Sequence, residues 1–341
     1  MSGSGKNPRV SIIMPVYNGA KFVAQAIQSV LAQDYGDYEI IVADDGSTDN
    51  TQEVLRQFGD KVTVLTLAHR GICATRNEAI RASRGEFIAL IDSDDLWEPH
   101  KLSLQIAYLD EHPEFALAYA YSTNFTDESE GNVNLVKKLD FEGFIFKDLF
   151  TKNSFANSTI VMRRPAFDEV GGYDESLLAM EDFELNLRIS RKYQIGRVPK
   201  SLVRRRIHPA SFYSSGYDNQ YIYQLPVYDK LLSDPEIENE IGTAKDDYMS
   251  GFILKFIFKN LYDQHPEFIP QKLKDLAGYS PAKAQLARKL VGEGTIALAD
   301  WSPLVPEFDA WYADVEHKAA LYKVRREKNF DARARGSRTT P

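Results

Sequence analysis

Cysteine is almost absent from this chain of 341 residues, which contains only Cys73. A single cysteine excludes an intrachain disulfide and a zinc site built from several cysteines. We expect Cys73 to be a small buried apolar residue rather than a reactive thiol. The pattern Gly-x-Gly-x-x-Gly is also missing after the first predicted strand, which argues against a dinucleotide-dependent dehydrogenase.

Long hydrophobic runs are missing as well. No stretch of about 18 apolar residues occurs, so no transmembrane helix is expected. Segment 1–8 lacks the apolar core of a signal peptide, and we expect it to be flexible. Gly5-Lys6 is followed by Asn7 and a strand, so it is not a Walker-type phosphate loop. These absences predict a cytoplasmic protein, either free or at the inner face of the membrane.

The sequence also lacks an excess of basic residues. The chain has 41 lysine and arginine residues against 49 aspartate and glutamate residues, which gives a net charge of -8. Nucleic-acid-binding proteins are normally basic, so nucleic acid is not an expected partner. With 43% hydrophobic and 26% charged residues, the composition is that of a folded globular protein. The length predicts two domains, or one domain with an extension.

Apolar strands alternate with helical patterns in the first third of the chain. Strands are expected over 10–14, 38–43, 62–67 and 87–91, and helices over 20–33, from 47 and over 71–82. This alternation predicts a parallel sheet covered by helices on both faces. Such sheets bind ligands at the carboxyl ends of their strands, which is where the polar clusters of this sequence lie.

The second half of the chain has a different pattern of predicted elements. We expect a helix from Pro99, a loop over 127–134 and further elements at 117–121, 158–162, from 165, from 181 and over 203–208. Beyond about residue 217 helical periodicity dominates, over 221–232, 243–262, 281–291 and 308–328. The aromatic segment 251–262 is either a helix packed on the catalytic domain or on a second subunit, or an interfacial membrane helix. The basic end, 329–341, is expected to be solvated or to contact anionic lipid.

Three carboxylates, Asp92, Asp94 and Asp95, follow the fourth predicted strand. Closely spaced carboxylates repel one another in a half-buried site, and a bound Mn²⁺ or Mg²⁺ would relieve this repulsion because hard cations prefer carboxylate oxygens. The i, i+2 spacing lets two of them lean the same way from an extended segment. The cation would then hold a diphosphate. The alternative interpretation is a turn or helix cap before Leu96.

Two further polar clusters follow strand ends. Asp45, in Asp44–Asp49, can accept hydrogen bonds from a base or a ribose, and the following helix N-terminus favours anions. An Asx-type turn with a helix cap is the other explanation. Tyr17 can stack on a base or pack on the sheet edge. Arg76, or alternatively Arg70, can contact phosphates, although a surface ion pair explains either arginine equally well.

Taken together, these motifs resemble glycosyltransferase family 2, an inverting family with the GT-A fold. The resemblance rests on the run Val10–Asn18, on Asp44–Asp49, on Arg76-Asn77 and on Asp92-Ser93-Asp94-Asp95, which match the family in order and spacing. It covers about residues 9–211 and leaves the C-terminal third unexplained. It implies an α/β domain with a mostly parallel, Rossmann-like sheet and a C-terminal helical extension.

The resemblance also implies roles for single residues. The residues expected to bind the nucleotide-sugar are Pro15, Tyr17, Asp45, Arg76, Asp92 and Ser93, with Asp45 against the uracil. Asp94 would bind the metal that meets the diphosphate. Asp95 would lie behind it or face the acceptor. His208 would bind the metal or the diphosphate; otherwise it is a strand-end histidine bonded to the backbone.

Glu181-Asp182 resembles the acidic pair on the acceptor side of the family. An inverting transfer needs a carboxylate that accepts the proton of the attacking hydroxyl, and Asp182 is the candidate general base. Glu181 would face the acceptor. Without the resemblance, both residues would be explained as acidic charge at a helix start.

The sequence thus predicts a single-sugar transferase, because the Gln-x-x-Arg-Trp motif of processive synthases is absent after His208. The donor is expected to be a nucleotide-sugar, most simply a UDP-sugar, and the acceptor a saccharide or lipid-linked saccharide. The rivals are a sugar nucleotidylyltransferase, whose glycine-rich loop is missing here, and an inactive binding module. The predicted parts are a catalytic domain over 9–215 and a helical extension over 216–328 that can mediate homo-oligomers. Within the catalytic domain, 9–98 is the nucleotide-binding (donor) half and 99–215 the acceptor-binding (acceptor) half.

Overall fold

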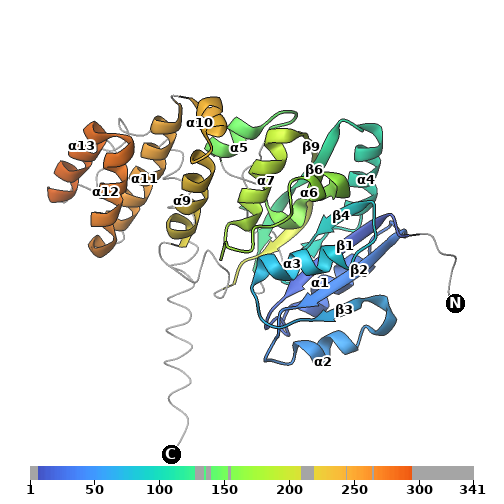
Figure 1. Ribbon diagram of the computed structural model, residues 1–341. Helices are drawn as coiled ribbons and strands as arrows, with labels where there is room; N and C mark the ends of the chain where they lie inside the picture. Colours follow the sequence, from blue (N-terminus) through green and yellow to red (C-terminus); the bar gives the residue numbers. More distant parts are fainter. Residues whose placement is uncertain are drawn as a thin grey trace, which may run out of the picture. The chain divides into compact units, whose positions relative to one another are not determined.

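A computed structural model of the protein describes residues 7–126, 134–135, 140–152, 155–208, 219–242, 244–262 and 265–293. The chain divides into two compact units, residues 1–230 and residues 231–341. Figure 1 shows the elements of both. The predicted helix over 308–328 and the basic end lie outside the described residues.

The first unit is built on one mixed sheet. Within the described residues its strand order is β3-β2-β1-β4-β8-β6-β9-β5, with β7 paired to β6. The parallel part consists of β1 (Val10–Val16), β2 (Tyr38–Asp44), β3 (Thr63–Thr66) and β4 (Phe87–Leu90). Then β8 (Val161–Arg163) runs antiparallel to β4 and to β6 (Phe115–Phe125). The expected parallel sheet is therefore confirmed for the first four strands and becomes mixed beyond them.

The apolar runs of the central strands form strands because both faces of the sheet are covered. Ile12 and Ile13 are neighbours in β1 and point to opposite faces, yet both are fully buried. One core cluster joins side chains of β1, β2 and β4 to the helices α1 (Val23–Leu31) and α4 (Lys101–Glu111). The remaining helices between the parallel strands are α2 (Thr51–Arg56) and α3 (Ile72–Arg81), and α3 contacts β1 and β2.

The acceptor half of the predicted domain contains the longest pairing. Strand β9 (Gln194–Arg206) runs parallel to β6, although only its end was predicted as a strand. The short strand β5 (Leu96–Trp97), which was not predicted, pairs with β9 through Leu96 and Arg204. This pairing brings the segment after β4 next to the end of β9. The helices here are α5 (Phe146–Lys152), α6 (Arg164–Glu169) and α7 (Glu181–Lys192).

Helix α9 (Asn219–Leu232) reaches the end of the first unit. Its Tyr228 is buried, packs edge-on against Phe150 and Phe183, and donates a hydrogen bond of 3.2 Å to the Phe150 carbonyl. These contacts explain why the division of the chain falls at residue 230, later than the predicted domain boundary at 215.

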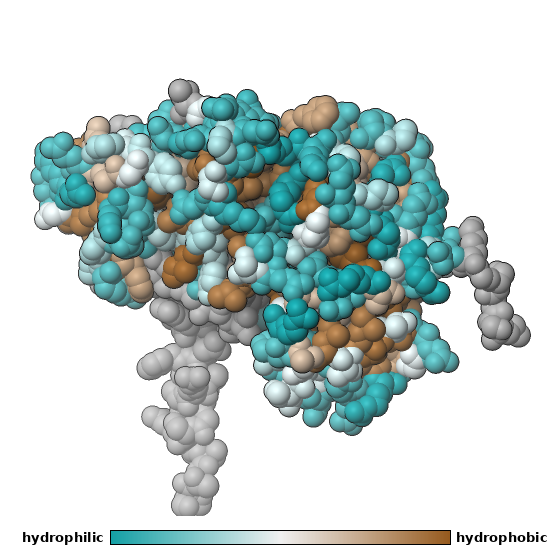
Figure 2. Space-filling view, viewed as in Figure 1, coloured by the Kyte–Doolittle hydropathy of each residue, from teal (hydrophilic) through white to brown (hydrophobic). Residues whose placement is uncertain are grey.

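The second unit is helical in its described part, as the periodicity predicted. It contains α10 (Pro235–Ile241), α11 (Ala244–Tyr262), α12 (Ile269–Tyr279) and α13 (Pro281–Gly292). Ile253, Leu254 and Ile257 of α11 are fully buried, and α11 packs against α12 of the same unit. Packing of this segment on the catalytic domain or on a second subunit stays a prediction. Among the described helices, none combines the length and the apolarity that crossing a membrane requires. The face seen in Figure 2 is mostly hydrophilic, with smaller hydrophobic areas.

Gly85 lies in the segment before β4, where the backbone approaches β1 so closely that we expect any larger residue to destabilise the protein. A Cβ at Gly85 would lie 2.4 Å from the Ser11 backbone nitrogen. We expect Gly85→Ala to lower the free energy of unfolding by about 1–3 kcal/mol, because the backbones must separate. Gly36→Ala, with nothing within 4 Å of the added atom, is the control and should change it little. Urea unfolding measures both; equal effects would contradict the prediction.

Candidate active site

The predicted site residues meet at the carboxyl ends of the parallel strands. Tyr17 follows β1, Asp45 follows β2, and the segment Asp92–Asp95 follows β4. Because β2, β1 and β4 are adjacent and parallel, these three ends lie along one edge of the sheet. Pro15 is buried within β1 and is paired with Ala43 of β2.

The two aspartates after β2 have different tasks. Asp44 is fully buried and accepts hydrogen bonds from the backbone N–H and the hydroxyl of Ser47, so it shapes the turn before α2. The Asp45 carboxylate accepts the backbone N–H groups of Arg70 at 2.9 Å and Gly71 at 3.0 Å. It therefore ties the end of β2 to the segment that begins α3.

An exposed aromatic pair lies beside Asp45. The ring of Tyr17 stacks on the imidazole of His69, with centroids 4.3 Å apart and planes 22° apart. Tyr17 is 48% exposed, so its ring does not pack into the sheet edge. The structure thus leaves Tyr17 accessible to a base, as the stacking interpretation requires, and adds His69, which sequence reasoning missed.

Arg76 of α3 joins the segment after β4 to the start of α7. Its Nη2 donates to Asp92 Oδ1 at 2.7 Å, and its Nη1 donates to Glu181 Oε1. The guanidinium also lies over the ring of Tyr173, 5.4 Å from the centroid. Burial lowers the pKa of Arg76, but the nearby Glu181 carboxylate, followed by Tyr173 and Asp92, raises the pKa well above its ordinary value. Arg76 is therefore a permanent cation among carboxylates.

Asp92 is held by three groups besides its chain neighbours. In addition to Arg76, the Asn157 amide donates to Asp92 Oδ1 at 3.4 Å, and the Asp92 backbone N–H donates to Ser158 Oγ at 3.0 Å. Asn157 and Ser158 belong to the short 3₁₀ helix Asn157–Thr159 before β8. Ser93 follows Asp92 and is half-buried.

Asp94 and His208 are brought together from distant parts of the sequence. His208 Nε2 lies 2.9 Å from Asp94 Oδ2, and both side chains are partly accessible. One carboxylate oxygen and one imidazole nitrogen are a donor set that suits Mn²⁺. Within the described part of the chain no group of three or more potential ligand residues surrounds one point. These two residues could supply two ligands to a cation, and its other ligands would have to come from outside the described residues, such as a diphosphate and water.

Asp95 points into the protein rather than toward an acceptor. Ser158 Oγ donates to Asp95 Oδ2 at 2.6 Å, and the Arg206 backbone N–H donates to Asp95 Oδ1 at 3.0 Å. Burial, together with the charges of Asp94 and Asp92, raises the pKa of Asp95 to about 8. Of the two predicted places for Asp95, the structure supports the one behind the site.

Arg206 locks the end of β9 to this segment, a task that the sequence did not reveal. Its Nε donates to the Asp94 carbonyl at 2.9 Å, and its Nη2 donates to Gln25 of α1 at 2.6 Å. The guanidinium lies over the rings of Phe22 and Phe125, 4.6 and 4.4 Å from the centroids. The consecutive residues Arg204, Arg205 and Arg206 alternate between the two faces of a strand, so the sequence does not show which of them is buried. The structure shows that Arg206 is buried.

Asp182 is the second residue of α7, and the helix is preceded by Met180, which adopts a left-handed conformation with φ of 63°. Such a conformation is strained for a side chain of this size and is typical of functional turns. Burial and the neighbouring Glu181 raise the pKa of Asp182 to about 7, against the opposing effect of Arg76. A carboxylate with a pKa near neutrality is suited to accept a proton.

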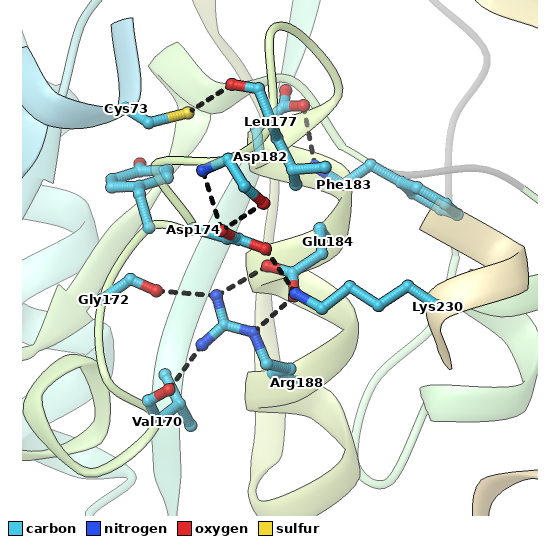
Figure 3. A network of polar contacts seen from close by, with 12 residues as sticks. Cys73, Val170, Gly172, Asp174, Leu177, Asp182, Phe183, Glu184, Arg188 and Lys230 are labelled. Atoms are coloured by element: carbon cyan, nitrogen blue, oxygen red, sulfur yellow. Dashed lines mark hydrogen bonds and ion pairs between the residues drawn. The ribbon is translucent and has the colours of Figure 1, made fainter. Parts of the chain in front are cut away.

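The turn that leads to Asp182 is fastened at several points (Figure 3). Cys73 Sγ–H donates to the Leu177 carbonyl at 3.2 Å, and Lys230 of α9 pairs with Asp174 and Glu184. Arg188 donates to the Gly172 carbonyl at 2.6 Å. Cys73 is buried, as expected, and this burial raises the pKa of its thiol to about 12.

Comparison with known proteins agrees with this geometry. The family model described as glycosyl transferase family 2 matches residues 11–171. An uncharacterized glycosyltransferase of Rickettsia typhi is 30% identical over 235 residues, which cover 67% of this chain and 71% of the relative. The family-model match includes the strand ends that carry Tyr17, Asp45 and Asp92.

Two solved structures share the fold. S. aureus TarS in complex with UDP-GlcNAc is 18% identical, with a TM-score of 0.60 over 89% of this chain and 92% of that chain. The mannosyltransferase PcManGT of Pyrobaculum calidifontis, in complex with GDP-Man and Mn²⁺, is also 18% identical, with a TM-score of 0.56 over 92% of this chain and 85% of that one. The predicted GT-A fold is thereby confirmed, and the chain belongs to glycosyltransferase family 2, a family of enzymes that transfer sugars.

Proposed function

We propose that the protein is an inverting, metal-dependent transferase that moves one sugar from a nucleoside diphosphate, most simply UDP, to a hydroxyl of a saccharide or lipid-linked saccharide. The observation that carries the proposal is that Arg76 pairs with Asp92 after β4 and with Glu181, the neighbour of Asp182, at the start of α7, while Asp94 of the same segment meets His208. TarS and PcManGT, which share the fold, were solved with nucleotide-sugars, and PcManGT also with Mn²⁺.

The donor side of the site follows from these positions. Tyr17 and Asp45 would bind the base, and Ser93 with Asp92 would bind the ribose and phosphates. Asp94 and His208 would hold a divalent cation, which supplies positive charge to the departing diphosphate when bound. Arg76 is already engaged by two carboxylates, so its contribution is to hold Asp92 in place and to balance negative charge rather than to bind phosphate alone.

The acceptor side needs a base. We assign this role to Asp182, whose carboxylate would accept the proton of the acceptor hydroxyl as that oxygen attacks the sugar carbon from the side opposite the diphosphate. The new glycosidic bond forms while the bond to the diphosphate breaks, so the sugar configuration inverts. Glu181 fixes the start of α7 through Arg76 and would line the acceptor side.

The first test concerns Asp94. We expect Asp94→Asn to reduce metal-dependent transfer by about 100-fold or more, because a neutral amide binds the cation poorly beside a diphosphate. Nucleoside diphosphate release from a panel of nucleotide-sugars measures the rate. Asp60→Asn, at an exposed position in the donor half, is the matched control. Full activity of the Asp94 variant would remove this residue from the mechanism, and pyrophosphate release would instead indicate a nucleotidylyltransferase.

A second test separates binding from chemistry. Asp182→Asn should keep UDP affinity within about twofold and lose about 10²–10⁴ in the rate of transfer, the usual contribution of a general base. Calorimetry with UDP and Mn²⁺ and an acceptor assay measure the two quantities. Asp168→Asn, an exposed aspartate in the acceptor half, is the control. If the Asp182 variant also fails to bind UDP, the assignment of the base is wrong.

The pH dependence follows from the raised pKa of Asp182. Since its pKa is raised to about 7 and the base acts in its deprotonated form, kcat/KM should rise with pH up to about 7 and level off above it. The slope of log kcat/KM against pH should approach 1 in the acidic range. A kcat/KM that stays constant from pH 5.5, about 1.5 units below that pKa, to pH 8, about one unit above it, would contradict this prediction.

The stability of the site should depend on Arg76. Arg76→Met leaves Asp92 and the buried Glu181 without their shared cation, so we expect the free energy of unfolding to fall by about 3–5 kcal/mol. Adding Glu181→Gln removes the buried charge and should restore more than half of the loss. Urea unfolding of the single and double variants measures both. Additive losses in the double variant would show that the two residues are not coupled.

A further inference from the structure

His69 lies at the base-binding end of the site, but none of the motifs points to it. It follows β3, and its side chain is 57% exposed while stacked on Tyr17. The stack fixes the plane of the imidazole, and the exposure leaves its outer edge accessible. The two rings together form an aromatic platform beside Asp45.

The contacts of His69 with Asp45 determine which ring nitrogen carries the proton. Nδ1 lies 2.9 Å from Asp45 Oδ2 and 3.1 Å from the Asp45 main-chain carbonyl oxygen. A carbonyl oxygen only accepts hydrogen bonds, so Nδ1 must be the donor. In the neutral ring the lone pair is then on Nε2. Within the described residues Nε2 has no hydrogen-bond partner, and it is the ring nitrogen on the edge away from Asp45.

The surrounding backbone is built to keep His69 in this position. Asp45 also accepts the N–H groups of Arg70 and Gly71, so one carboxylate binds three successive residues. Gly46 has a positive φ of 73°, and a Cβ there would lie 3.0 Å from the His69 backbone nitrogen. A larger residue at Gly46 would push this segment away. With these three bonds made, much of the hydrogen-bonding capacity of Asp45 is used within the chain.

We infer that His69 is a specificity residue for the base of the donor, and that Asp45 acts on the base through it. This inference rests on the proposed nucleotide-sugar function. Nε2 would accept a hydrogen bond from a ring N–H on the pairing edge of the base, while Tyr17 offers a stacking face. Uracil, at N3, and guanine, at N1, carry such an N–H. Cytosine and adenine have a lone pair at the corresponding position, which would face the lone pair of Nε2.

The test compares UDP with CDP in calorimetric titrations of the full chain with Mn²⁺. The unaltered protein should bind UDP about tenfold or more tightly than CDP. The reason is that uracil donates a hydrogen bond to Nε2, whereas cytosine faces Nε2 with a lone pair. His69→Phe keeps an aromatic ring against Tyr17 but has no lone pair, and its preference should fall to about twofold or less. His69→Gln, which offers an amide oxygen, should recover part of the preference. His112→Phe is the control, because His112 packs similarly against Tyr108 away from the site.

The possible outcomes test the role of His69 and the proposed nucleotide-sugar function separately. A His69→Phe protein that keeps the full preference for UDP would overturn the inference and return direct recognition of the base to Asp45. Circular dichroism checks that the variants fold, and UDP binding that is retained but unselective supports the inference without depending on activity. If the unaltered chain binds neither UDP nor GDP, the proposed function fails together with the inference.

Discussion

The buried guanidinium of Arg76 between Asp92 and Glu181 is the interaction on which the arrangement of the site depends. Carboxylates from the end of β4 and from the start of α7 would repel one another if they were brought this close without a cation. Arginine is suited to this position because its charge persists when it is buried and its planar fork meets two carboxylates at once. The Tyr173 ring beneath it adds a favourable face. Helix α3 therefore fixes the distance between the proposed donor and acceptor sides.

A second set of polar contacts performs the same task at the end of β9. Arg206 binds the Asp94 carbonyl and the Asp95 carboxylate, and Ser158 donates to Asp95 from the other side. As a result Asp95 is buried while Asp94 stays accessible beside His208. Neighbouring residues of one motif thus acquire different properties from their partners. The motif alone specifies three carboxylates, whereas the fold decides which one can meet a ligand.

This difference shows what could be predicted from the sequence. The first four strands and their polar ends were predictable, because continuous apolar runs and turn residues are local signals. Strand β5 and most of β9 were not, since two residues of β5 carry little periodicity and β9 contains Pro199 and charged residues that conceal its pairing. Arg206 and His69 were missed for a related reason. Their contacts span 24 to 181 residues of sequence, and no local pattern encodes such pairs.

The same principle accounts for the proposed division of labour among the carboxylates. Asp92 is paired with Arg76, whose Nη2 donates a hydrogen bond of 2.7 Å to Asp92 Oδ1. For Asp182, burial and the adjacent Glu181 carboxylate raise the pKa and outweigh the opposing charge of Arg76. A carboxylate paired with a cation suits the binding of a ribose or a cation complex, while a carboxylate with a pKa near neutrality suits proton transfer. The position of one arginine therefore distinguishes the carboxylate proposed to bind the donor from the carboxylate proposed as the base.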